Sequence, residues 1–392
     1  MQVVPYFAPA FAYGGPPTSV HQLSKALAAR GHEVSVLTSD ALDSSSRQPS
    51  RHTRNGLDIY YLKNLSNYLA WNHQLFFPLG TNAFLRRRIA DFDVIHVHMF
   101  RTYQNVATRR YARRTGIPYV LSAHGSTPRI VRKTLAKKLF DLAIGQHVLR
   151  DAAGLIALSV SERHQYENMG IPPSKITVIP NGIDAREFES PPVRGTFAKK
   201  HGLSGKQIIT YIGRLNARKG LDTLLESFRQ IAEVRDDVAL ALVGPDDGYK
   251  GHIEKVVRRF QLTAAVVITG MITMPEKLAV FEDSAVVVYP GAFEIFGLVP
   301  FEALLCGKPI IVADDSGCGE IVSREKIGLT VGVGDSEGLE AAIGTILENP
   351  ESTADMTRRG RMFVLTQLDW SKIAGQTESV YRDLTGRNEN RA

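Results

Sequence analysis

Two glutamates, Glu294 and Glu302, lie eight residues apart on either side of a glycine turn and a proline. The run 285–289 before them is short, apolar and β-branched, which predicts a buried strand. The run 301–305 predicts a helix, with Pro300 at its first position, where the missing N–H costs nothing. One carboxylate can accept hydrogen bonds from a ribose diol. The other can face a sugar ring, where positive charge develops as a glycosidic bond breaks, and this layout is typical of a nucleotide-sugar site.

Gly297 lets the chain turn sharply into this helix, because glycine tolerates backbone conformations that other residues avoid. The N–H groups of Gly297, Leu298 and Val299 are then predicted to be free at the helix start, where they can bind an anion. The alternative is structural, since acidic residues near a helix N-terminus suit the helix dipole without any ligand. Spacing alone leaves both interpretations open.

A second group of residues follows the apolar run 207–212, which predicts another strand. The loop after it carries Arg214 and Lys219, and the residues from Leu221 onward have helical spacing. Arg214 offers a rigid fork of donors and Lys219 a compact point charge. Together they suit a diphosphate, both bound and as a leaving group. The alternative is that they are ordinary solvated loop charges.

Together the two groups resemble the retaining glycosyltransferases of family 4, whose fold is GT-B. Further segments similar to that family follow in the expected order: Gly14-Gly15 after the first strand, 93–98, 119–125, 178–184 and 310–322. The resemblance implies an α/β protein of two Rossmann-like domains, with parallel sheets that face each other across a cleft. It also implies a C-terminal helix that crosses back to the first domain.

The resemblance implies roles for individual residues as well. Glu294 is expected to anchor the sugar hydroxyls near the reacting carbon, and His124 to lie beside the donor sugar, so these two are the expected catalytic residues. Glu302 is expected to hold the ribose and Met271 to lie near the base. The full set of expected donor contacts is Gly14, Gly15, Arg214, Lys219, Met271, Phe296, Gly297, Leu298 and Glu302.

Length and the order of elements predict two domains. At 392 residues the chain is too long for one ordinary core. Strand-like runs alternate with helix-like runs, which favours parallel sheets. We expect a first domain over residues 1–188 with about 370–392, and a second over 195–368. A Pro-containing linker is expected at 184–196.

Two segments of the first domain have less regular patterns. Residues 41–56 are rich in Ser and Arg and predict a loop. The segment 65–79 is aromatic without strand alternation, and either packs in the core or forms a surface for an acceptor or a membrane; we favour the core. His96 and His98 lie two apart on an expected strand and therefore share one face, a spacing that could ligate a metal. No third ligand is evident, so no metal is expected.

Composition excludes several classes of protein. The two cysteines, Cys306 and Cys318, cannot form a disulfide framework or a zinc cluster, which fits a reducing cytoplasm. No apolar run approaches the roughly 20 residues that a spanning helix needs. The loop at Gly14-Gly15 is not G-x-G-x-x-G, which argues against a dinucleotide-binding dehydrogenase.

The basic residues are concentrated in the first half of the chain. Lys and Arg outnumber Asp and Glu over residues 1–190, with clusters at 86–88, 109–114 and 129–138. A basic patch can bind an anionic membrane or a phosphorylated acceptor. Nucleic acid is not expected as a partner, because no nucleic-acid-binding signature accompanies the charge. Ordinary solvated helix faces are the alternative.

The sequence therefore predicts a metal-independent hexosyltransferase without a cofactor. It would move a hexose, with retention, from a UDP- or GDP-linked donor to a hydroxyl acceptor such as a lipid-linked glycan. We expect it in the cytoplasm, at the inner face of the membrane. The alternatives are a nucleotide-sugar 2-epimerase of the same fold and a non-catalytic protein that binds nucleotide sugars.

Overall fold

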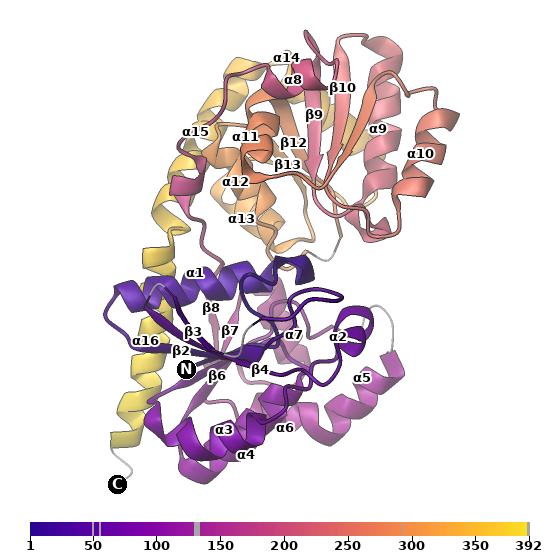
Figure 1. The fold of residues 1–392 in the computed structure, drawn as a ribbon. Coiled ribbons are helices and arrows are strands. Elements are labelled where there is room, and N and C mark those ends of the chain that lie inside the picture. The colour runs from indigo at the N-terminus through magenta and orange to yellow at the C-terminus, as the bar shows by residue number, and fades with distance from the viewer. Residues whose placement is uncertain (49–50, 55, 129–133, 293, 390–392) are drawn as a thin grey trace. The chain divides into compact units, whose positions relative to one another are not determined.

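A computed structural model describes the chain apart from residues 49–50, 55, 129–133, 293 and 390–392. The chain divides into two compact units, which we call unit 1 (Met1–Gly182 with Trp370–Ala392) and unit 2 (Ile183–Asp369) (Figure 1). The change from unit 1 to unit 2 falls just before the segment 184–196 that the sequence marks as a linker. Among the helices that the structure describes, none is long and apolar enough to cross a lipid bilayer.

Unit 1 is built on an eight-stranded sheet in the order β3-β4-β2-β1-β5-β6-β7-β8. All neighbouring strands run parallel except β3 and β4, which form an antiparallel hairpin. The strands are β1 (Gln2–Val3), β2 (Val34–Ser39), β3 (Arg51–Arg54), β4 (Leu57–Leu62), β5 (Ile95–His98), β6 (Tyr119–Ser122), β7 (Gly154–Ala157) and β8 (Ile176–Val178).

The prediction of a loop over residues 41–56 was wrong for its last part, because Arg51–Arg54 form β3. Among the strands that the structure describes, β3 is the first in the order of the sheet and pairs with β4 alone. An edge strand leaves one side open to solvent and tolerates polar and charged residues. The local pattern therefore contains no apolar alternation from which a strand could be predicted. Residues 49–50 and 55 lie outside the described part of the chain.

The helices of unit 1 pack on both faces of this sheet, with one buried apolar cluster on each face. The last helix, α16, packs against α1, and Arg30 Nε donates to Glu378 Oε2 at 2.7 Å between them. The prediction that the C-terminal helix returns to the first domain is confirmed. The helices are α1 (Pro16–Ala29), α2 (Asn67–His73), α3 (Thr81–Arg88), α4 (Tyr103–Thr115), α5 (Thr134–Phe140), α6 (Gln146–Arg150), α7 (Val160–Asn168) and α16 (Trp370–Glu389).

Unit 2 is built on a six-stranded sheet in the order β11-β10-β9-β12-β13-β14, parallel throughout. The strands are β9 (Gln207–Ile212), β10 (Val238–Val243), β11 (Val266–Gly270), β12 (Ser284–Tyr289), β13 (Ile310–Ala313) and β14 (Leu329–Val331). The helices are α8 (Thr196–Lys200), α9 (Leu221–Val234), α10 (Lys250–Arg259), α11 (Met274–Asp283), α12 (Val299–Leu305), α13 (Gly317–Glu325), α14 (Ser336–Glu348) and α15 (Pro350–Gln367). The predicted α/β class is thus confirmed in both units.

The strand order places the loops that carry the candidate residues. In unit 2 the order reverses between β9 and β12, which are neighbours while their following strands lie on opposite sides. In unit 1 the same reversal lies between β1 and β5. Ligands of open α/β sheets bind at such reversals, beyond the carboxyl ends of the strands. The loops after β9 and β12 in unit 2, and after β1 and β5 in unit 1, are therefore the places to look for a site.

The aromatic segment 65–79 belongs to the core only in part. Phe76 is buried and lies 5.0 Å from the ring of Tyr6, so the core interpretation holds for it. Tyr68 on α2 is 66% exposed, and Trp71 is partly exposed beside Tyr13. The sequence pattern could not tell the buried rings from the exposed ones, because they follow one another without the spacing of a helix or a strand.

Candidate functional site

The two groups of charged residues that the sequence singles out meet in unit 2. Lys219 Nζ forms an ion pair with Glu294 Oε1, and the two side chains are only 15% and 18% exposed. Their loops follow β9 and β12 and touch directly, since Ala292 N donates to Arg218 O at 3.2 Å. Gly220 permits this approach: it has φ +66°, and a Cβ there would lie 2.3 Å from Pro290 O. Lys219 and Glu294 are thus held at the reversal of the strand order.

Further contacts fix the Glu294 carboxylate and its backbone. Tyr289 Oη donates to Glu294 Oε2 at 3.2 Å, and Gly317 N donates to Glu294 O at 2.7 Å. Burial and the Glu294 charge raise the pKa of Tyr289 far above its ordinary value, so its hydroxyl stays protonated and can donate. Only glycine fits at position 297 beside this ring. Gly297 has φ +72°, and a Cβ there would lie 2.9 Å from the Tyr289 ring. The Glu294 carboxylate is therefore held by an ion pair with Lys219 and a hydrogen bond from Tyr289, and the Glu294 backbone is held by Gly317.

Glu302 has a lysine of its own. Lys277 Nζ on α11 lies 2.5 Å from Glu302 Oε2, and the side chains are 20% and 14% exposed. The contact is an ion pair without hydrogen-bond geometry. Helix α12 begins at Val299, so Pro300 is its second residue rather than the first as predicted, and Glu302 is its fourth. Each of the two predicted glutamates is thus held by a lysine from another element.

Arg214 lies in the same loop as Lys219 but contacts a different partner. Arg214 Nη1 lies 3.3 Å from Asp247 Oδ2, and both side chains are largely exposed. Exposed ion pairs contribute little to stability, so a ligand can displace this one readily. Burial and the Glu294 charge raise the pKa of Tyr211, and the Arg214 charge lowers it. Both charges therefore act on the same buried hydroxyl at the end of β9.

The other predicted donor contacts of unit 2 differ in exposure. Phe296 is buried and stacks on Phe301 with ring centroids 5.3 Å apart, so its side chain supports the loop from the core. A donor contact at this position would come from the backbone. Leu298 directly precedes α12. Met271 follows β11 and is 76% exposed, which leaves its side chain free to contact a ligand.

In unit 1 the predicted residues lie at the carboxyl ends of the strands. Gly14 and Gly15 follow β1, and Gly15 directly precedes α1. Gly14 has φ +113°, which favours glycine, whereas Gly15 has φ −70° and a Cβ there would meet no atom within 4 Å. His124 follows β6 and has φ +50°, a left-handed conformation that is uncommon outside glycine. Strained backbone of this kind clusters at functional sites.

The histidines of unit 1 are joined to one another. His124 Nε2 lies 2.9 Å from His98 Nδ1, and burial lowers the pKa of His124 to about 4. His96 and His98 share one face as predicted, with ring centroids 4.1 Å apart. All four of their ring nitrogens have hydrogen-bond partners within unit 1. In the part of the chain that the structure describes, no group of three or more His, Cys, Asp or Glu side chains is placed to hold a metal.

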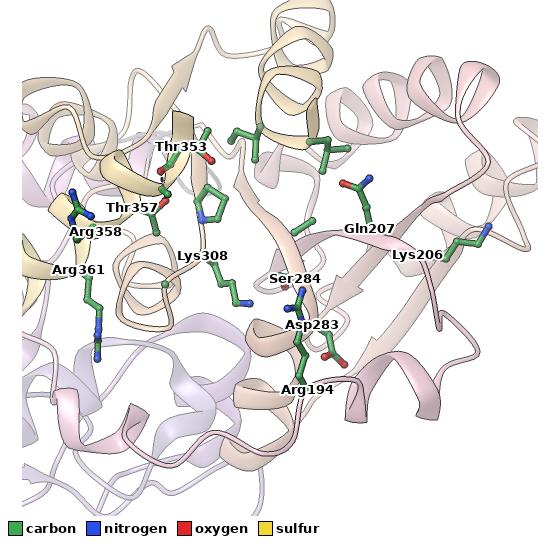
Figure 2. A pocket seen from close by; sticks show the side chains of 16 residues that line it. Arg194, Lys206, Gln207, Asp283, Ser284, Lys308, Thr353, Thr357, Arg358 and Arg361 are labelled. Atoms are coloured by element: carbon green, nitrogen blue, oxygen red, sulfur yellow. Dashed lines mark hydrogen bonds between the residues drawn. The ribbon is translucent and has the colours of Figure 1, made fainter. Parts of the chain in front are cut away.

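A cavity of about 690 Å³ lies at the opposite edge of the unit 2 sheet, among the amino ends of the strands (Figure 2). Arg194, Lys308 and Arg361 are among the residues that line it. The acid in its wall is Asp283, which accepts hydrogen bonds from Ala198 N at 2.8 Å and from Gly195 N. None of the predicted donor contacts lines this cavity, so it is separate from the site around Glu294.

Sequence reasoning missed three partners of the predicted residues: Lys277, Tyr289 and Asp247. Tyr289 ends the predicted strand before Glu294, so its place in the sequence could have indicated that the two residues are close. Lys277 and Asp247 carried none, because each comes from another element and meets its partner only in the folded unit.

Two family models match the chain. Residues 13–187 match the model described as Glycosyltransferase Family 4, and residues 193–363 match the one described as Glycosyl transferases group 1. Between them the matches span most of both units.

Individual relatives are similar over nearly the whole chain. Glycogen synthase of Mycobacterium tuberculosis is 27% identical, over 95% of this chain and 92% of its own length. Phosphatidyl-myo-inositol mannosyltransferase of Mycobacterium leprae is 28% identical, over 94% and 92%. Among solved structures, sucrose-phosphate synthase of Thermosynechococcus elongatus has a TM-score of 0.81 at 24% identity, covering 98% of this chain and 99% of its own. Anabaena Alr3699/HepE, solved in complex with UDP-glucose, has a TM-score of 0.75 at 19% identity, covering 97% and 99%.

Proposed function

Because the chain belongs to glycosyltransferase family 4 and has the GT-B fold, we propose that it is a retaining, metal-independent hexosyltransferase with a UDP- or GDP-linked sugar as donor. The observation that carries this proposal is the Lys219–Glu294 ion pair at the strand-order reversal of unit 2. It puts a cation that suits a diphosphate directly beside a carboxylate that suits a sugar. Among the relatives, the name phosphatidyl-myo-inositol mannosyltransferase states the transfer of a hexose, mannose, and the name glycogen synthase states the synthesis of a glycan.

The departing diphosphate is assigned to the loop after β9. Lys219 supplies one positive charge from a largely buried position, and Arg214 supplies a second from an exposed one. Fixed charges aimed at the place where negative charge develops stabilise the transition state without reorganising. These two cations would do the work that a divalent metal does at other diphosphate sites, and this is why we propose metal-independent transfer.

The two glutamates are assigned to different parts of the donor. Glu302, oriented by Lys277, accepts hydrogen bonds from the ribose diol. Glu294 binds hydroxyls of the hexose and stabilises the positive charge that develops at its anomeric carbon. Tyr289 and Lys219 orient the Glu294 carboxylate for that role.

We further propose that unit 1 contacts an anionic membrane and that the acceptor hydroxyl lies on a lipid-linked molecule. Leu135 and Leu139 on α5 and Leu142 just after it are 69%, 59% and 66% exposed. Their spacing puts them on one face of the helical segment. Lys138 is exposed beside them, and the segment is anchored from within by Arg101 Nε, which donates to Asp141 Oδ1 at 2.8 Å.

An exposed apolar strip flanked by cations is typical of a helix that lies in a membrane interface. The other basic clusters support this less strongly. Arg88 pairs with Asp91, and Arg109 and Arg113 pair with Asp151, so part of their charge is neutralised locally. Residues 129–133 of the third cluster lie outside the described residues. With two free cysteines, we place the enzyme at the cytoplasmic face of such a membrane.

The test is a donor screen followed by product analysis. Thermal shifts with UDP, GDP and ADP identify the base, since a ligand at about 100 times its dissociation constant adds about 2.7 kcal/mol of stability. The matching hexose donors are then supplied with lipid-linked and soluble hydroxyl acceptors, with and without EDTA. We expect hexose transfer that survives EDTA, and NMR of the product should show the anomeric configuration of the donor.

Three outcomes would contradict the proposal. Loss of transfer in EDTA with rescue by manganese or magnesium would make the enzyme metal-dependent. A product with the opposite anomeric configuration to the donor would exclude a retaining mechanism. Conversion of the donor sugar without any acceptor would identify a 2-epimerase instead.

A further inference from the structure

The cavity at the amino ends of the unit 2 strands, which we call the basic cavity, is rich in positive charge. Its volume of about 690 Å³ lies within the range of roughly 300–1,000 Å³ that is typical of small-molecule sites. All the residues that line it belong to unit 2, so it lies within one compact unit. Five of them are cationic and one is acidic: Arg194, Lys206, Lys308, Arg358, Arg361 and Asp283 (Figure 2).

The fold brings these residues together from distant parts of the sequence. β9, β12 and β13 are neighbours in a parallel sheet, so their amino ends lie at the same edge, and Lys308 comes shortly before β13. Helix α15 forms another wall, where Thr353, Thr357 and Arg361 follow one another at intervals of four and share one face. The loops around Glu294 leave the carboxyl ends of the same strands. The basic cavity is therefore a second candidate site, apart from the one proposed for the sugar donor.

The acid of the basic cavity is engaged by the backbone. Asp283 accepts hydrogen bonds from Ala198 N at 2.8 Å and from Gly195 N. Because Arg194 directly precedes Gly195, these bonds also hold the backbone of Arg194 beside the cavity. Within the described part of the chain, Asp283 forms no ion pair with a cation.

Two cations of the basic cavity have no anionic partner among the described residues. Arg194 is exposed and its guanidinium makes neither an ion pair nor a hydrogen bond there. Lys308 is partly buried, and its Nζ donates only to a backbone oxygen, Glu282 O, at 2.7 Å. Figure 2 shows the Lys308 and Arg194 side chains extending towards the same space.

The electrostatics of Lys308 agree with this geometry. Burial lowers the pKa of Lys308, the Glu282 charge opposes the lowering, and the Arg194 charge adds to it. Arg194 and Lys308 thus repel each other across the cavity. An anion bound between them would remove the repulsion, because each cation would gain an opposite charge nearby.

The remaining cations are less available to a ligand or lie on the other wall. Arg358 Nη2 lies 2.6 Å from Asp355 Oδ1, and Lys206 Nζ donates to Asp236 O. Arg361, on α15, adds positive charge to the wall opposite no carboxylate of its own among the described residues. Arg194 and Lys308 are therefore the two cations that we assign to direct contact with a ligand.

The types of side chain indicate the class of ligand. An arginine fork can donate to two oxygens of one phosphate, and a lysine ammonium can donate to a third. The aliphatic side chains of Pro309, Ile346 and Leu347 can cover an organic group attached to that phosphate. Among the described residues that line the cavity none is aromatic, so no ring is present there on which a nucleobase could stack.

We propose that Arg194 and Lys308 bind the phosphate group of a small phosphate ester that has no nucleobase, such as a sugar phosphate. The ligand occupies the basic cavity, with its phosphate between the two cations and its organic part against the aliphatic wall. This inference goes beyond the proposed function and does not depend on it, because binding in the basic cavity requires no transfer of a sugar.

Calorimetric titration with glucose 6-phosphate as the probe tests the inference. We expect the parent to bind it, and Arg194→Ala and Lys308→Gln each to weaken binding about 10-fold or more, since each removes a charged donor to the phosphate. Glutamine at 308 removes the charge but keeps a hydrogen-bond donor for Glu282 O. Glucose and inorganic phosphate, which each lack one half of the probe, should bind more weakly than the probe.

The matched control is Arg258→Ala, which removes an exposed arginine of α10 outside the basic cavity and should leave the affinity for glucose 6-phosphate unchanged. Thermal unfolding of each variant without the probe checks that it is folded; since Arg194 is exposed and unpaired, Arg194→Ala should match the parent.

Four results would overturn the inference. The parent might bind neither glucose 6-phosphate nor inorganic phosphate in the millimolar range. Arg258→Ala might weaken binding as much as Arg194→Ala does, which would show a general effect of charge. Inorganic phosphate might bind as tightly as the ester, which would exclude an organic ligand. Finally, binding that depended on Lys219 instead of Arg194 and Lys308 would place the probe at the site around Glu294.

Discussion

The ammonium group of Lys219 forms an ion pair with the carboxylate of Glu294, although the two residues lie 75 positions apart in the chain. Both side chains are largely buried, and each was assigned to a different part of the donor from sequence. In the free protein the cation that we propose for the diphosphate is thus already paired with the carboxylate that we propose for the sugar. A bound diphosphate has to share Lys219 with Glu294.

The ion pair predicts opposite effects of its two ends on nucleoside diphosphate binding. Lys219→Ala should weaken binding about 10- to 100-fold, since a hydrogen bond to a charged group is worth roughly 1.5–3 kcal/mol. Glu294→Gln should tighten binding about 3- to 10-fold, because it removes a negative charge that competes for Lys219. Calorimetric titration with the nucleotide from the donor screen measures both.

Two controls accompany these variants. Tyr289→Phe removes the hydrogen bond to Glu294 but keeps its charge, so nucleotide affinity should not change. Arg361→Ala removes a cation from the cavity at the opposite edge of the sheet and should also leave affinity unchanged. If the parent, Lys219→Ala and Glu294→Gln bound the nucleotide with equal affinity, the assignment of the diphosphate to this site would be wrong.

Substitutions of the two glutamates should change different steady-state constants, KM for Glu302 and kcat for Glu294. Ribose does not change between ground and transition states, so Glu302→Ala should raise the donor KM more than it lowers kcat. Glu294→Gln keeps shape but loses charge where positive charge develops, so kcat should fall on the order of 100-fold or more. Glu254→Ala on α10, whose side chain is 41% exposed and pairs with Lys250, is the control. A near-parental kcat for Glu294→Gln together with a large loss for Glu302→Ala would mean that the roles are reversed.

Gly15→Ala tests whether a ligand approaches the loop after β1. The backbone of Gly15 is compatible with alanine and a Cβ would meet nothing within 4 Å, so the free protein should keep its stability. The donor KM should nevertheless rise, because a methyl group would occupy the space in front of the amide. Gly251→Ala on α10, where a Cβ also meets nothing, controls for the substitution itself. An unchanged KM would show that Gly15 does not contact the donor.

Membrane binding should depend on the apolar strip of α5. Replacing Leu135, Leu139 and Leu142 together by serine should abolish sedimentation with vesicles that contain anionic lipid. Binding by the parent should weaken with salt, since exposed charges are screened over roughly 10 Å at ~0.1 M. Val234→Ser, an 80% exposed apolar residue of unit 2, is the control. Parent protein that sediments equally with neutral and anionic vesicles at low salt would count against the proposal.

The stability of unit 1 should fall as the pH drops below about 6.5, the ordinary pKa of histidine. Burial lowers the pKa of His124 to about 4 and those of His96 and His98 well below the ordinary value. The unfolded chain therefore takes up protons between pH 6.5 and 4 that the fold excludes, and stability is lost as pH falls. Each such histidine contributes a slope of about 1.4 kcal/mol per pH unit in that window.

Glu162 opposes this trend. Burial raises its pKa to about 7, so its contribution is present at low pH and is lost as pH rises from about 4.5 to 7. Urea unfolding followed by tryptophan fluorescence at pH 7.5, 6.5 and 5.5 measures the balance, because Trp71 and Trp370 both lie in unit 1. Glu162→Gln removes the opposing titration and should steepen the loss. A parent protein equally stable at all three pH values would refute the assignment of the histidines as buried and neutral.

Much of the fold follows from short-range pattern. The β-branched runs at 207–212 and 285–289 form β9 and β12, and the helix after Gly297 forms where its spacing predicts it. These elements are readable because burial on both faces of a parallel strand demands a continuous apolar run. Strand β3 could not be predicted in this way, since a strand at the edge of a sheet needs no continuous apolar run.

Residue type and local spacing in the sequence identified Lys219, Glu294 and Glu302 as candidates, and the family resemblance added His124, which follows a predicted strand. The partners of these residues were decided by tertiary structure alone. The contacts of Lys277 with Glu302, of Tyr381 with His96 and of Lys219 with Glu294 all join different elements. The physical reason is that local propensity acts over a few residues, whereas contacts between loops depend on strand order, and strand order is set by how the whole unit buries its apolar faces.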